Sequence, residues 1–154
     1  TFNQNNSMTV VVNGGTGPYL YAVDNGPFQE SNVFYNLTPG IHHVSLTDID
    51  NCTDVTKNVM VLGYPNFFTP NGDGVNDFWN IYYFDTQPNA RVYIFDRYSK
   101  LLTVLSPQSP GWDGTYNGKM MPSTDYWFMV EFNDYNAKGE RVWQTFRSHF
   151  SMLR

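Results

Sequence analysis

A short polar segment that follows two aromatic residues has the side chains needed to bind a cation. It contains Asn71, Asp73 and Asp77, interleaved with two glycines. Carboxylate and amide oxygens on alternate residues around a sharp glycine turn are typical of calcium-binding loops. The EF-hand pattern is incomplete, because its first position would be Thr69 and its twelfth Asn80 instead of a bidentate Glu. We therefore favour a tight turn whose Asx side chains bond their own backbone, and keep calcium as the alternative.

The other reactive side chains do not form a catalytic pattern. His42 and His43 are neighbours in a predicted strand and point to opposite faces, and His149 lies far along the chain. No serine or cysteine stands in a G-x-S-x-G nucleophile motif. Cys52, the single cysteine, has no partner for an intramolecular disulfide, and we expect it to be a small buried residue. We therefore predict that the protein is not an enzyme and has no cofactor.

The composition favours β structure and excludes several kinds of partner. Aromatic residues make up 18% of the 154-residue chain and charged residues only 15%, with 12 glycines and 9 prolines to form turns. The net charge of −5 argues against nucleic-acid binding and against a polybasic membrane surface. No run approaches the roughly 20 apolar residues of a membrane span, so we expect no transmembrane segment. There is no signal peptide at Thr1, and because the chain begins in the middle of a pattern we expect it to be part of a longer protein.

Short β-branched and aromatic runs, separated by turn residues, recur along the whole chain. In the first part they predict strands at residues 8–12, 19–23, 33–35, 41–47 and 55–62. In the second part they predict strands at residues 79–84, 91–96, 101–105, 126–132 and 142–153, with a hairpin turn at Asn117–Gly118. This spacing predicts an all-β protein of two consecutive immunoglobulin-like antiparallel β-sandwiches, residues 1–62 and 63–154.

The second part has more aromatic residues than one sandwich interior needs. Consecutive rings such as Tyr126, Trp127 and Phe128 must point to opposite faces of a sheet, so some are core and others are available to a partner. A terminal strand at a sheet edge also has free backbone groups that can pair with another chain. As partner-binding residues we predict Trp127, Phe146, Phe150, Met152, Leu153 and Arg154.

Several motifs of the second part resemble the type B C-terminal domain of the type IX secretion system in Bacteroidetes, the gliding-motility-associated C-terminal domain. They are residues 68–77 (FTPNGDGVND), 94–100 (IFDRYSK), 112–119 (WDGTYNGK), 121–126 (MPSTDY) and 149–154 (HFSMLR). Tyr98 and Ser99 depart from the family pattern, in which that strand ends in Asn-Arg-Trp-Gly. Residues 1–62 resemble a repeat of SprB-type cell-surface adhesins, through residues 14–19, 34–40 and 47–52.

The resemblance implies a non-catalytic signal that is read at the outer membrane. It implies export by the type IX secretion system to the cell surface or the extracellular space, with the outer-membrane translocon and a PorP/SprF-type outer-membrane protein as partners. It also implies a role in a gliding-motility adhesin. The residues leave one alternative open, a carbohydrate- or surface-binding sandwich in which exposed Trp and Tyr rings stack on sugars and the acidic loop holds calcium.

Overall fold

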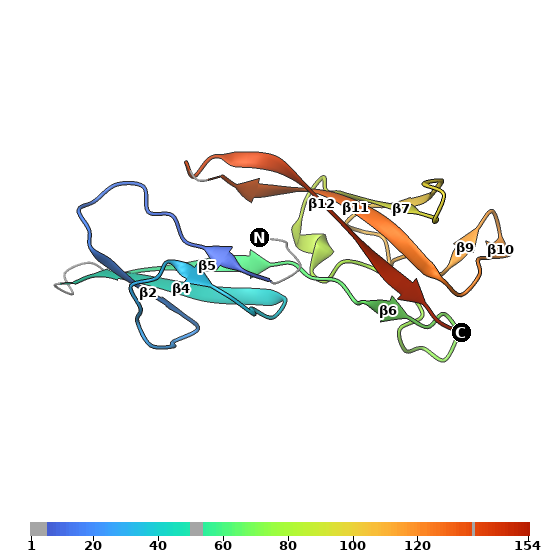
Figure 1. Cartoon of the computed structure of the whole chain (residues 1–154), viewed down its shortest axis with the longest axis horizontal. Helices are drawn as coiled ribbons and strands as arrows, with labels where there is room; N and C mark the ends of the chain where they lie inside the picture. Colours follow the sequence, from blue (N-terminus) through green and yellow to red (C-terminus); the bar gives the residue numbers. More distant parts are fainter. Residues whose placement is uncertain (1–5, 50–53, 137) are drawn as a thin grey trace. The chain divides into compact units, whose positions relative to one another are not determined.

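The computed structural model describes residues 6–49, 54–136 and 138–154, and within them the regular secondary structure is β-strand apart from one short 3-10 helix (Figure 1). The predicted all-β class is therefore confirmed. Among these described residues, no helix could span a membrane. Cys52 and its predicted burial lie outside the described residues.

The chain divides into two compact units. The first contains Thr1–Gly63 together with Tyr135–Arg141, and the second contains Tyr64–Asp134 together with Val142–Arg154. The predicted division into domains at residues 1–62 and 63–154, and the immunoglobulin-like form of each, stay predictions.

The first unit contains a two-stranded and a three-stranded antiparallel sheet. In the smaller sheet, β1 (Met8–Thr9) pairs with β3 (Val33–Phe34). In the larger one, β4 (Gly40–Asp48) lies between β2 (Tyr19–Val23) and β5 (Asp54–Val61). These strands form within one or two residues of most predicted positions, because β-branched and aromatic runs there are bounded by turn residues.

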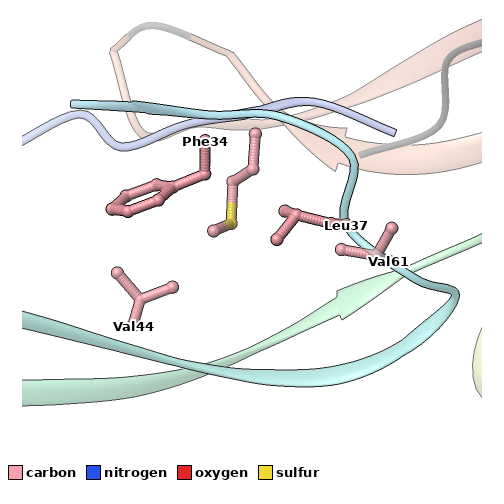
Figure 2. Packing of buried hydrophobic residues seen from close by; sticks show 5 residues of the cluster. Phe34, Leu37, Val44 and Val61 are labelled. Atoms are coloured by element: carbon pink, nitrogen blue, oxygen red, sulfur yellow. The ribbon is translucent and has the colours of Figure 1, made fainter. Parts of the chain in front are cut away.

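Side chains from both sheets meet in one hydrophobic core. Met8 and Phe34 come from the smaller sheet, and Val44 and Val61 from the larger one. Figure 2 shows the labelled side chains of Phe34, Leu37, Val44 and Val61 gathered in the same interior. Burying a side chain of this size contributes about 1.5–3 kcal/mol, so this small cluster is a main source of the unit's stability.

A histidine of β4 is buried beside this core. His42 Nδ1 lies 2.6 Å from Asp24 Oδ2, and its Nε2 lies 2.7 Å from the carbonyl oxygen of Thr38. Both neighbours accept hydrogen bonds, so the imidazolium, which has two N–H donors, satisfies both. Burial lowers the pKa of His42, but the bonds to Thr38 and to the Asp24 carboxylate outweigh it and raise the pKa above the usual 6.5.

We expect the first unit to lose stability as the pH rises above the unfolded pKa of His42, about 6.5. His42 binds its proton more tightly in the folded unit than in the unfolded chain. Its contribution is therefore complete below the unfolded pKa of about 6.5 and is lost as the pH rises through the folded pKa. Thermal unfolding, followed through the NMR signals of Phe34 and Val44, should show a falling Tm across this range, and His42→Gln should flatten the profile. A Tm that rises with pH in the unaltered chain would contradict this assignment.

The second unit is built on a five-stranded sheet in the order β6-β12-β11-β7-β8. The strands in that order are Phe67–Phe68, Arg141–Met152, Asp125–Tyr135, Arg91–Phe95 and Leu101–Leu105. The pairs β11–β7 and β7–β8 are antiparallel, whereas β6 runs parallel to the end of β12. The predicted Asn117–Gly118 hairpin is confirmed: it joins β9 (Thr115–Tyr116) to β10 (Lys119–Met120), and both turn residues have positive φ.

The predicted strand at residues 79–84 is wrong. Trp79 forms only an isolated bridge with Trp112, and the chain continues into a short 3-10 helix, η1 (Phe84–Thr86). Tyr83, just before that helix, has a left-handed backbone with φ of 59°. Trp79 and Phe84 are buried in the core. The apolar pattern therefore reflects an irregular segment that fills the interior, and pattern alone does not distinguish such a segment from a strand.

Candidate functional site

The acidic loop after β6 closes on itself through the side chain of Asp77. Its Oδ1 accepts the backbone N–H groups of Asn71 at 3.0 Å and Gly72 at 2.7 Å, and its Oδ2 accepts that of Gly74 at 2.8 Å. These three bonds, the one from Gly72 above all, lower the pKa of Asp77 below its usual value. The Asp77 carboxylate therefore stabilises a tight turn by accepting hydrogen bonds from the backbone of its own loop.

The second predicted cation ligand has a similar role in the turn. Asp73 accepts the backbone N–H of Val75 and the side-chain amide of Asn71, both at 2.8 Å. Across residues 6–49, 54–136 and 138–154, no three His, Cys, Asp or Glu side chains gather in a way that could hold a metal ion. The Asx-turn interpretation accounts for the hydrogen bonds that these two carboxylates accept, and calcium binding stays an untested alternative.

The end of the sequence lies beside this loop (Figure 1). The backbone N–H of Leu153 donates to Phe68 O at 3.0 Å, and Arg154 Nη1 donates to Met121 O at 2.9 Å. Gly114 is packed so closely here that an added Cβ would lie 3.2 Å from Pro70 and 3.3 Å from Arg154 Nη2. The predicted partner residues Leu153 and Arg154 are exposed. Their hydrogen bonds to Phe68 and Met121 fix their positions.

Two of the predicted partner-binding side chains are in the core. Phe150 and Met152 are fully buried, and the Phe150 ring stacks on Trp79 with centroids 3.9 Å apart. This corrects the prediction that they contact a partner, because neither side chain reaches the surface of the folded unit. The physical reason is that the end of β12 is flanked by both β6 and β11, so its inward side chains complete the interior.

Phe146 and Trp127 lie on opposite faces of the five-stranded sheet. The half-buried ring of Phe146 lies 6.0 Å from the ring of the buried Phe128, on the face that covers the core. Trp127 is 43% exposed on the other face, opposite Phe95 of β7 and with its ring 6.4 Å from that of His149. Of the aromatic residues predicted to bind a partner, only Trp127 is displayed openly.

The exposed face that contains Trp127, here called the outer face, also carries Phe95, His149 and Arg147 and, toward the start of β12, Trp143. Trp143, 57% exposed, was not among the predicted residues. The exposed residues 145, 147 and 149 alternate along β12 with the more buried residues 146, 148 and 150, and Trp143 continues the same odd-numbered positions beyond the exposed Gln144. Exposed tryptophans on a sheet whose other face is core are typical of an interaction surface.

A family model described as CHU_C Type IX secretion signal domain matches residues 62–146 of this chain. The matched region contains the acidic loop, the β9–β10 hairpin, Trp127 and Trp143. Among solved structures, the crystal structure of dimeric latent PorU from Porphyromonas gingivalis is similar, with a TM-score of 0.35 and 15% sequence identity. The similarity covers 92% of this chain but only 16% of the PorU chain. No curated protein matches the chain.

Proposed function

Because the chain belongs to the family of type IX secretion signal domains, we propose that its second unit is a folded, non-catalytic signal that the secretion system reads through the outer face. The family membership means that the protein is exported through the outer membrane, to the cell surface or the extracellular space. Which surface of the module is read, and by which component, is the proposal.

We further propose that the chain is the C-terminal region of a gliding-motility adhesin, retained at the surface by a PorP/SprF-type outer-membrane protein. The support is the resemblance of residues 1–62 to an SprB-type repeat and of residues 64–154 to type B domains. The first unit, a compact β-module with its own small core, suits a repeat that separates an adhesive region from an anchor.

One observation carries the proposal of a recognition surface: Trp127 and Trp143 are exposed on β11 and β12, two strands whose inward rings, Phe128 and Phe150, are buried in an aromatic core. Indole rings on a solvent-facing sheet leave a large apolar area in contact with water. Docking on a partner would remove that area from water. Because these rings do not contribute to the interior, we expect recognition and folding to be separable by mutation.

Replacing both outer tryptophans should block export without unfolding the module. We expect Trp127→Ser/Trp143→Ser to leave a reporter, fused in front of the whole chain, in the periplasm of a bacterium with a type IX system. Tyr98→Ser is the matched control, because Tyr98 is 81% exposed but lies in the β7–β8 turn. Circular dichroism should show all variants folded. Normal surface delivery of the double variant would refute recognition through the outer face.

A further inference from the structure

Strand β12 has a partner strand on both sides only at its end. Its side away from β11 meets β6 at two residues, where Phe67 lies opposite Ser151 and Phe68 opposite Met152. Here the backbone N–H of Ser151 donates to Asn66 O at 2.9 Å. In the described part of the chain, no other strand pairs with this side of β12.

Pro65 explains why β6 does not continue along β12. Proline has no N–H to donate to a strand ladder, and the Pro65 carbonyl instead accepts the indole N–H of Trp79 at 2.8 Å. Just before it, Tyr64 packs its ring against Phe128 on the core side of the sheet, with centroids 4.8 Å apart. The chain thus passes beneath the sheet and leaves the edge open beside residues 143–149.

The register of the β11–β12 hairpin identifies the backbone groups at this open edge. At the two ends of the hairpin, Met152 N–H donates to Thr124 O at 3.0 Å and Asn136 N–H donates to Glu140 O at 2.9 Å. Both bonds belong to one antiparallel register, in which alternate residues direct N–H and C=O toward the partner strand or away from it. The N–H and C=O groups that point outward are therefore those of Trp143, Thr145, Arg147 and His149.

The charge of β12 indicates what kind of strand would fit. The strand contains two arginines and one histidine and no acidic residue, although the whole chain carries a net charge of −5. Arg147 is exposed on the outer face and forms no ion pair within the described ranges. A second copy of β12 would bring like charges together, which opposes pairing, whereas a strand with acidic side chains on this face would be attracted.

We propose that the β12 edge at residues 143–149 accepts an extended segment of another protein as an added β-strand, with acidic side chains of that segment facing Arg147. The new strand would extend the line of β6 and lie beside Trp143, so that backbone bonds supply affinity and the outer face supplies selectivity. This inference rests on the proposed function for its setting, because it identifies the chemistry of the partner that reads the outer face.

Hydrogen exchange on the purified chain tests the inference without any export step. Before a ligand is added, the amide protons of Thr145 and Arg147 should exchange fast, and those of Phe146 and Ser148, which pair with β11, slowly. The probe is a capped peptide of alternating valine and glutamate, long enough to span residues 143–149. It should slow exchange at Thr145 and Arg147, whereas the same peptide with methylated backbone amides should not.

Charge variants complete the test. Arg147→Glu should weaken binding of the valine–glutamate peptide by roughly tenfold. Arg91→Glu changes the net charge equally but lies on β7, inside the sheet order, and should change binding little. Unchanged exchange with peptide, equal binding of a valine–lysine peptide, or protection that grows with protein concentration alone would each overturn the proposal; the last would make a second copy the occupant. Failure here with export still dependent on Trp127 would leave the proposed function standing.

Discussion

Trp79→Ala should bring the second unit close to unfolding. Trp79 is fully buried, stacks on Phe150 at 3.9 Å and lies 4.8 Å from the ring of Phe128. Its indole N–H also donates a hydrogen bond to the carbonyl oxygen of Pro65, near the start of the second unit. Truncating a buried aromatic residue to alanine typically costs about 3–5 kcal/mol, and the total stability of a small domain is only about 5–15 kcal/mol.

Denaturant unfolding of the whole chain, followed at Val92 and Ile94 by NMR, measures this effect on the second unit. Trp127→Ala is the matched control, because it removes the same side chain from an exposed position and should change stability by less than about 1 kcal/mol. Equal losses for the two variants would show that Trp79 does not anchor the core. Both variants should fail in export. Trp79→Ala should fail because the unit unfolds, and Trp127→Ala because a ring of the outer face is missing.

Gly111→Ala should destabilise the second unit by about 3 kcal/mol, because its added Cβ would collide with backbone and not with a movable side chain. Gly111 has φ of 124°, and an added Cβ would lie 2.7 Å from the carbonyl oxygen of Trp79 and 3.1 Å from Phe78 Cβ. Trp79 and the adjacent Trp112 exchange two backbone hydrogen bonds of 2.9 Å. An alanine methyl group must therefore displace backbone, and with it the bridge that positions both rings.

Gly118→Ala separates this crowding from the conformational cost of positive φ. Gly118 has φ of 73° but faces open space, so alanine there meets no atom and should cost only about 1–2 kcal/mol. The difference between the two variants in urea unfolding measures the close contact at Trp79. Equal losses of stability for the two alanine variants would contradict this, because they would show that the Trp79–Trp112 backbone bridge shifts to accept the methyl group at little cost.

Local sequence patterns were sufficient where a strand is interior to a sheet and bounded by turns. Residues 91–96 were predicted to form a strand, and the apolar side chains on both of its faces are typical of a strand that is central or covered. In the structure β7 lies between β11 and β8, with Val92 and Ile94 fully buried and Tyr93 and Phe95 half-buried. The hairpin at Asn117–Gly118 was equally readable, because both residues tolerate the positive φ that such a turn requires.

Long-range pairing was not readable in the same way. The parallel contact of β6 with β12 joins Phe67 to Ser151, residues far apart along the chain, and nothing in either segment indicates the other. That contact makes the end of β12 an interior strand and buries Phe150 and Met152. The prediction placed Phe150 and Met152 at a partner surface because burial depends on neighbours that sequence periodicity does not identify.

The candidate surface was predictable in type but not in detail. An excess of rings on consecutive positions correctly indicated that some aromatic residues lie outside the core. Choosing among them requires strand register, because a shift by one residue exchanges the two faces. Once His149 is placed beside Trp127, the odd-numbered positions of β12, Trp143 among them, follow onto the same face. The acidic loop followed local turn chemistry, and its Asx bonds are those that the turn interpretation predicts.

Crosslinking in cells during export tests most directly whether the outer face is what the secretion system reads. An aromatic photo-crosslinking residue would be placed at position 127 of the whole chain, and in separate variants at position 98 as an exposed control. We expect position 127 to crosslink to an outer-membrane component of the type IX system, and position 98 to give no such product. Crosslinks from position 98 but not from 127, in a chain that is still exported, would contradict the account.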